Sequence, residues 1–270
     1  IIHISDYLSN SNKEIAAIIN NIIKKDNISL VLFEGDHLSI FDVNFIELID
    51  SNIKKGIFLQ DDYMYHYVNR ITASACDFVF PADPLSALKF QELGYETLWL
   101  PVESSGSIFK DSQQEKIHDV LFFGRLKNNR SNIIKYLKDN DIKIVQCGPS
   151  DEISNTPEKL TKLINQSKIV LNFTESDNTD NFLNPLSSFK YFFHIKGRVY
   201  FVGMCGTLSI TEYSPAHELL FDDNELPQFH TKEDCLVILK DYLSDSIKLK
   251  ETTQRYKEKC MKFEDSIYIK

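Results

Sequence analysis

Short apolar runs typical of buried β-strands alternate with longer segments of helical periodicity along the first hundred residues. The helical pattern is clearest over residues 13–25, where five isoleucines share one face: Ile15, Ile18, Ile19, Ile22 and Ile23. The runs that predict strands lie at residues 1–4, 29–33, 56–59, 77–80 and 97–100. Alternating strands and helices are typical of a parallel sheet with helices on both faces.

One helix of this first series carries signals at both of its ends. Asp83 is a good N-cap, Pro84 suits the first helical position, and Gly94 suits the position just after a helix. The spacing therefore predicts a helix that begins after Asp83 and ends before Gly94.

The same rhythm resumes after a polar stretch that contains Ser104-Ser105-Gly106-Ser107. Strands are expected at residues 119–123, 142–147, 168–173 and 207–211, and helices at 131–138, 157–166, 189–204, 232–243 and 248–262. The sequence thus predicts an α/β protein of two doubly wound domains, residues 1–103 and 117–245. A linker is expected at 104–116 and a C-terminal helical segment at 246–270. This segment could pack back on the first domain.

Composition and charge narrow the class of protein. Acidic residues outnumber basic ones by 39 to 30, for a net charge of −9, which argues against a sequence-independent nucleic-acid binder. We see no apolar run of about 20 residues that would cross a membrane, and no signal peptide. The five cysteines form no CxxC pair, so we expect neither a zinc site nor a thioredoxin-type centre, and we expect reduced thiols in the cytoplasm.

Arginine and glycine are scarce, and several of them gather near predicted turns of the second domain. Gly124 ends a strand, and Arg125 and Arg130 follow it, five residues apart. Guanidinium groups match phosphate geometry, and glycine lets a backbone approach a ligand closely. This pattern suits a diphosphate-binding site, although turn glycines beside surface arginines would give the same spacing.

A second motif begins at Lys196-Gly197-Arg198 and continues through Cys205-Gly206-Thr207 to Glu212-Tyr213-Ser214 and Glu218. The motif resembles the C-terminal domain of GT-B glycosyltransferases, which have two facing Rossmann-like domains, and most closely the CgeB-like, "glycosyl transferases group 1" type. The resemblance implies a nucleotide diphosphate sugar, held mainly by the second domain in the cleft between the two.

The resemblance also assigns roles to residues. Arg125 matches a family arginine and Arg130 takes the place of a lysine, both of which contact the donor diphosphate. Further donor contacts are implied for Gly124, Lys196, Gly197, Arg198, Glu212, Tyr213, Ser214 and Glu218. The sequence departs from the family at two glutamate positions, one of which normally binds ribose: Phe193 and Phe201 stand there.

Two adjacent carboxylates are the candidate catalytic residues of the first domain. Asp61 and Asp62 follow the expected strand 56–59, at its carboxyl end, and Asp61 takes the place of a histidine in related enzymes. A carboxylate there can act as a general base on an acceptor hydroxyl. An N-cap for the next helix explains one of the two equally well.

These observations predict a glycosyltransferase that moves a sugar, of the hexose type, from a nucleotide diphosphate sugar to a glycan, lipid-linked or protein acceptor. We expect no cofactor and no metal ion, and a cytoplasmic location that includes the inner face of the membrane, as in polysaccharide biosynthesis. Two alternatives stay open: a nucleotide-sugar epimerase, and a non-catalytic nucleotide- or glycan-binding protein, which Phe193 and Phe201 would suit.

Overall fold

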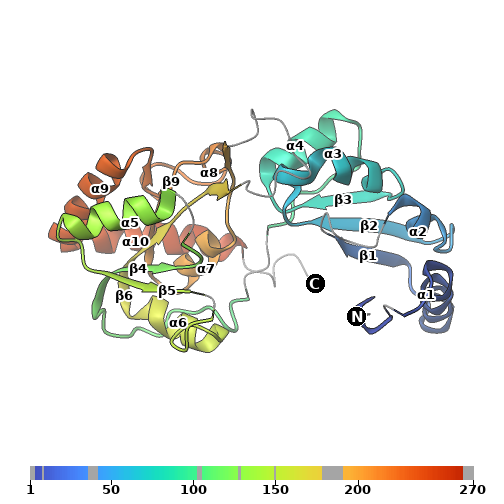
Figure 1. Cartoon of the computed structure of the whole chain (residues 1–270), viewed down its shortest axis with the longest axis horizontal. Coiled ribbons are helices and arrows are strands. Elements are labelled where there is room, and N and C mark those ends of the chain that lie inside the picture. Colours follow the sequence, from blue (N-terminus) through green and yellow to red (C-terminus); the bar gives the residue numbers. More distant parts are fainter. Residues whose placement is uncertain are drawn as a thin grey trace. The chain divides into compact units, whose positions relative to one another are not determined.

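The computed structural model of the chain divides into two compact units, Ile1–Pro101 and Val102–Lys270, which are described separately below (Figure 1). It describes residues 4–7, 9–35, 42–101, 105–126, 129–148, 150–177 and 191–263. Both units are α/β, with parallel sheets. None of the helices in these ranges is long and apolar enough to cross a membrane.

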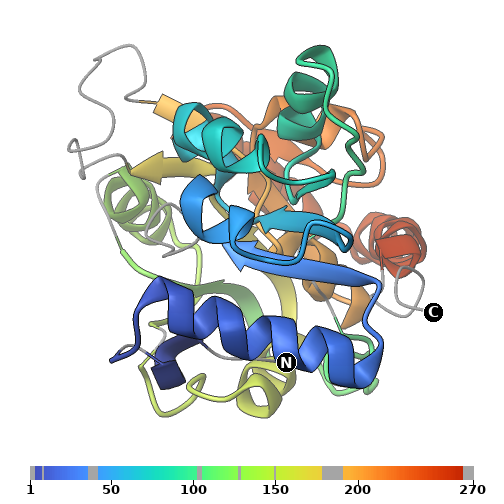
Figure 2. The same cartoon turned by 90° about the vertical axis from the view of Figure 1, so that its right-hand side faces the viewer.

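The first unit is built on a three-stranded parallel sheet in the order β1-β2-β3. Its strands are β1 (Leu30–Gly35), β2 (Lys54–Leu59) and β3 (Phe78–Pro81). The helices, of which α1 is seen along its full length in Figure 2, are α1 (Asn12–Asp26), α2 (Val43–Glu47), α3 (Asp62–Ala73) and α4 (Pro84–Glu92).

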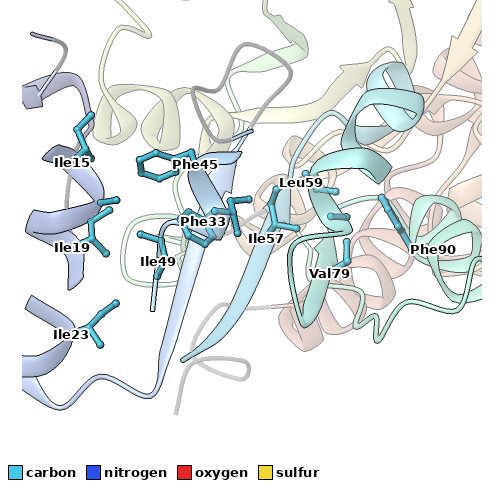
Figure 3. Packing of buried hydrophobic residues seen from close by; sticks show 13 residues of the cluster. Ile15, Ile19, Ile23, Phe33, Phe45, Ile49, Ile57, Leu59, Val79 and Phe90 are labelled. Carbon is cyan, nitrogen blue, oxygen red and sulfur yellow. The ribbon is translucent and has the colours of Figure 1, made fainter. Parts of the chain in front are cut away.

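Apolar faces of strands and helices make one continuous core in the first unit. Figure 3 shows Ile15, Ile19 and Ile23 of α1 pointing toward Phe33 of β1, as the helical periodicity predicts. The cluster continues through the β2 and β3 side chains to Phe90 of α4. This packing fixes the position of the carboxyl end of β2. The candidate carboxylates, Asp61 and Asp62, follow this strand end.

Local signals place the ends of these elements. Asp83 caps α4 by accepting hydrogen bonds from the N–H groups of Leu85 and Ser86, and Gly94 has a φ of 84°, as expected after a helix. The strand expected at residues 97–100 is reduced to a parallel bridge between Thr97 and Val79, although the N–H groups of Leu98 and Leu100 also donate to carbonyl oxygen atoms of β3. Of the strand expected at 1–4, residues 1–3 lie outside the described ranges and Ile4 begins a 3-10 helix.

The second unit contains a five-stranded sheet in which all pairs are parallel, flanked by helices and by a short antiparallel hairpin of β7 and β8. The strands are β4 (His118–Phe123), β5 (Ile144–Cys147), β6 (Ser167–Asn172), β7 (Glu175–Asp177), β8 (Tyr191–Phe193), β9 (Leu208–Glu212) and β10 (Gln228–Phe229). The helices are α5 (Asn129–Asp139), α6 (Pro157–Asn165), α7 (Arg198–Met204), α8 (Pro215–Glu218), α9 (Lys232–Ser244) and α10 (Ser246–Cys260).

The strand order of this sheet, β10-β9-β6-β4-β5, defines where a ligand is expected. The chain runs outward from β4 to β5 and then returns to the other side of β4 with β6, so the order reverses between β4 and β6. In open α/β sheets, ligands bind outside the carboxyl ends of the strands at such a reversal. The segments that follow Phe123 of β4 and Asn172 of β6 are therefore the expected ligand-binding positions.

The long apolar segment before β9 differs from its prediction. A helix was expected over residues 189–204, but Tyr191–Phe193 form strand β8 and the helix α7 begins only at Arg198. The apolar run suits a strand as well as a helix, so its composition alone does not separate the two.

The terminal helix α10 packs on α7 within the second unit. The Tyr256 hydroxyl donates a hydrogen bond to the Val199 carbonyl oxygen, and a Cβ on Gly203 would lie 2.7 Å from the Cys260 Cβ. Glycine at position 203 therefore lets the two helices approach closely.

Candidate functional site

A half-buried arginine lies at the carboxyl end of β4. Arg198, the first residue of α7, donates from Nη1 to the Phe123 carbonyl oxygen at 2.7 Å, and its guanidinium carbon lies 5.2 Å from the centroid of the Phe123 ring. Gly124 has a φ of 133°, and a Cβ there would lie 3.1 Å from Arg198 Nη1. Position 124 therefore favours glycine for two reasons: the backbone has a positive φ, and the Arg198 guanidinium group lies close to where a side chain would begin.

A second arginine reaches the same region from the first turn of α5. Arg130 donates from Nη2 to the Glu175 carbonyl oxygen at 2.7 Å, just after β6, and from Nη1 to the Arg125 carbonyl oxygen at 3.4 Å. The two arginines are therefore anchored to the segments that follow β4 and β6, on both sides of the reversal. The side chain of Arg125 itself is exposed.

His194 and Lys196 complete a group of basic side chains, which we call the basic cluster: Arg130, His194, Lys196 and Arg198. The Lys196 ammonium contacts His194 Nε2. Burial, followed by the charge of Lys196, holds the pKa of His194 well below its usual value, and Arg130 and Arg198 add to the effect. Burial and the charge of Arg130 lower the pKa of Arg198 to about 10. These groups raise one another's electrostatic free energy, which a bound anion would lower.

Glu212, at the end of β9, supports the turn that holds Arg130. Its buried carboxylate accepts hydrogen bonds from the N–H groups of Thr174 at 3.0 Å and Glu175 at 2.7 Å. Burial raises the pKa of Glu212, while these two donors oppose the rise. Because Arg130 binds the Glu175 carbonyl oxygen, Glu212 acts on Arg130 through this backbone turn.

Two residues that follow Glu212, Tyr213 and Glu218, line a cavity away from the basic cluster. The Tyr213 hydroxyl interacts with the Glu218 carboxylate, which raises the pKa of Tyr213, and both residues line a cavity of 370 Å³ together with side chains of α9. Ser214 is buried and its N–H donates to Gln228 Oε1 at 3.3 Å. No residue of the basic cluster lines this cavity, so the structure separates Tyr213 and Glu218 from the arginines.

An aromatic stack occupies one of the two positions where the family usually has glutamate. The Phe201 ring stacks on Phe109 with the ring centroids 4.3 Å apart, and on Phe123 at 6.0 Å. Phe193 ends strand β8. The Phe201 side chain, unlike a glutamate, offers no group that binds ribose hydroxyls.

In the first unit, the two candidate carboxylates have different surroundings. Asp61 is exposed and precedes α3 without a capping hydrogen bond from its side chain. Asp62 is fully buried, and its two oxygen atoms bind Nδ1 of His66 at 2.8 Å and Nδ2 of Asn69 at 2.9 Å. Asp62 therefore orders its own helix, and Asp61 is the carboxylate that solvent can reach.

Sequence reasoning gave no site role to His66 or Glu175, and it favoured a solvated or capping role for His194 over contact with a phosphate. The spacing of four residues between Asp62 and His66 is a signal that could have paired them, since such residues share a helix face. Glu175 carries no comparable signal, because only the tertiary structure brings its carbonyl oxygen to Arg130. Among the residues that the structure describes, no group of three or more His, Cys, Asp or Glu side chains is placed to hold a metal ion.

Solved structures similar to this chain share its fold. Sucrose-phosphate synthase from Thermosynechococcus elongatus has a TM-score of 0.61 at 8% identity, over 94% of this chain and 74% of that protein. HepE from Anabaena, solved with UDP and glucose, has a TM-score of 0.61 at 10% identity, over 96% of this chain and 81% of HepE. TarM has a TM-score of 0.62 at 10% identity, over 94% of this chain and 56% of TarM. The fold is the GT-B fold of two Rossmann-like domains.

Sequence comparison gives the family. No curated protein sequence matches this chain. The model of the glycosyl transferase-like family matches residues 130–264, half of the chain, and the match begins at Arg130 of the basic cluster. The chain therefore belongs to the glycosyl transferase-like family.

Proposed function

We propose that this protein transfers a sugar, of the hexose type, from a nucleoside diphosphate sugar to a glycan, lipid-linked or protein acceptor. The observation that carries the proposal is the basic cluster at the strand reversal of the second unit, within the family-matched region. HepE, of similar fold, was solved with UDP-glucose, which supports a uridine diphosphate sugar as the first donor to test.

In this proposal the donor diphosphate binds Arg130, Lys196 and Arg198. Negative charge grows on the diphosphate as the bond to the sugar breaks, and guanidinium groups already held in place stabilise that charge without reorganising. Arg198 is anchored through Phe123 and Arg130 through Glu175, so both are fixed before the ligand arrives. These side chains supply the positive charge, and the proposal assigns no metal ion.

Asp61 is the proposed general base for the acceptor hydroxyl. Its side chain is exposed, whereas the Asp62 carboxylate is already bound to His66 and Asn69. Replacement of Asp61 by Asn is expected to lower kcat and to leave donor affinity unchanged, because the change removes the base and keeps the shape. The matched change Asp62→Asn is expected to lower stability.

The aromatic stack of Phe201 favours a second candidate function, a nucleotide-sugar-binding protein without transfer activity. The test is a panel of UDP- and GDP-sugars, each followed for binding and for release of nucleoside diphosphate, with and without a panel of glycan and lipid-linked acceptors. Acceptor-dependent release that Arg198→Ala abolishes supports the transferase. Binding without release supports the second candidate, a changed sugar without acceptor supports an epimerase, and absence of binding overturns the donor site.

A further inference from the structure

A second positively charged hollow lies at the opposite edge of the sheet in the second unit. Four lysines line a cavity of 260 Å³, which we call the lysine cavity: Lys116, Lys168, Lys250 and Lys257. Lys116 precedes β4 and Lys168 lies near the start of β6, so the cavity is at the amino ends of the strands. The basic cluster is at the carboxyl ends, and none of its members lines the lysine cavity.

Two of the four lysines are neutralised by carboxylates. Lys257 binds Asp111 at 2.8 Å, and Lys168 binds Asp119 at 2.7 Å. Asp111 also lines the cavity and is held against Gly206, where a Cβ would lie 2.6 Å from its Oδ2. The walls of the cavity are thus fixed by ion pairs and by close backbone packing.

Lys116 is the residue that points most directly to an anion. Its Nζ donates to the Gly206 carbonyl oxygen at 3.1 Å and to Thr207 Oγ1 at 2.8 Å, both neutral acceptors. An ammonium group has three donors, so these two bonds leave one for a ligand. Burial lowers the pKa of Lys116 to about 8, although Asp111 opposes this effect. An anion in the cavity would stabilise the charged form of Lys116.

The remaining wall comes from the first half of α10, with Lys250 and the residues of its first turn. Lys250 is exposed and adds a cation at the mouth of the cavity. The Asp245 carboxylate caps the start of α10 by accepting hydrogen bonds from the N–H groups of Ile247 and Lys248, so the positive charge of the cavity comes from the lysines and not from the helix dipole. This concentration of positive charge stands out in a chain whose net charge is −9. Lysine ammonium groups are compact point charges that suit phosphate.

We propose that the lysine cavity binds a small phosphate-bearing anion, at a site separate from the donor diphosphate. The ligand would contact Lys116 and Lys250 and so connect the segment before β4 to α10. The proposal does not depend on sugar transfer, because it rests on residues outside the basic cluster.

Calorimetric titration of the full chain with inorganic phosphate and with a hexose phosphate, at constant ionic strength, tests the proposal. The variants are Lys116→Met and Lys250→Ala, and the controls are Lys240→Ala, an exposed lysine of α9, and Arg130→Ala. Each cavity variant is expected to weaken phosphate binding at the lysine cavity by about tenfold, since one charge-assisted hydrogen bond is lost. Lys240→Ala should leave all phosphate binding unchanged, and Arg130→Ala should keep the binding event that the cavity variants weaken. The exposed position of Lys250 keeps the test valid if Lys116→Met fails to fold.

The outcomes separate this site from the donor site. Loss of phosphate binding in Arg130→Ala with no change in the cavity variants would overturn the proposal, because the phosphate then binds only at the arginines. Equal weakening in Lys240→Ala would overturn it as non-specific attraction, and so would absence of binding. Tighter binding of the hexose phosphate favours a phosphate ester as the occupant, and equal binding of both shows that the cavity recognises the phosphate group alone.

Discussion

Replacement of Arg130 by alanine separates ligand binding from folding. Without ligand, the variant loses the hydrogen bond to the Glu175 carbonyl oxygen, worth about 1 kcal/mol, and the long, weak one to the Arg125 carbonyl oxygen. It also relieves the repulsion from Arg130 that, after burial, lowers the pKa of Arg198. These two changes have opposite signs, so we expect the free energy of unfolding of the unliganded protein to change by less than about 1 kcal/mol.

Ligand binding responds much more strongly to the same change. A charge-assisted hydrogen bond to phosphate is worth about 1.5–3 kcal/mol, so the Kd for UDP should rise by about 10- to 150-fold. At a UDP concentration about 100 times the wild-type Kd, the ligand adds about 2.7 kcal/mol to the stability of the wild type. The same concentration should add about 1.4 kcal/mol or less to Arg130→Ala.

Thermal unfolding with and without UDP, supported by titration calorimetry, measures both effects. Lys135→Ala is the matched control, since Lys135 is an exposed cation on the same helix α5. Arg125→Ala should weaken UDP binding less than Arg130→Ala, because the Arg125 side chain is exposed. A wild-type Kd in Arg130→Ala, or an equal loss in Lys135→Ala, would refute the role given to Arg130.

Three further changes test other parts of the structure. Gly124→Ala should cost about 1–3 kcal/mol of stability, because alanine is strained at a φ of 133°. It should also weaken UDP binding, because the added Cβ displaces Arg198, and unchanged binding in a folded variant would contradict this. Gly203→Ala should cost about 1–3 kcal/mol in urea unfolding by forcing α10 away from Cys260, and wild-type stability would refute the close approach. Burial lowers the pKa of His217 to about 4, so the contribution of His217 to stability is complete above pH 6.5 and should fall by about 3 kcal/mol as the pH drops toward 4. His217→Gln should remove this part of the acid loss and leave the part that comes from His194. Equal pH profiles of the two proteins would show that His217 is not responsible.

Much of the fold could be predicted because its signals are local. Buried strand runs and capping residues such as Asp83 and Gly94 depend on neighbours within a few residues, and the structure confirms an α/β protein with parallel sheets. The apolar run before Arg198 was assigned to the wrong element, because β8 pairs with a strand that lies beyond the range of any local pattern.

The candidate site could be predicted only in part. Scarce arginines beside glycines indicated Arg130 and Arg198, but the sequence did not show that Glu212 reaches Arg130 through the turn at Glu175. Nor did it separate Asp61 from Asp62, since the burial of Asp62 depends on the packing of α3. Burial and long-range hydrogen bonds arise from the tertiary structure, and a motif carries neither.

The most direct test of the donor site is a crystal structure of the protein with UDP. We expect the diphosphate oxygen atoms to lie about 2.7–2.9 Å from the guanidinium nitrogen atoms of Arg130 and Arg198, the usual distance for such charge-assisted hydrogen bonds. A diphosphate bound in the lysine cavity, or anywhere else away from these two arginines, would contradict the account.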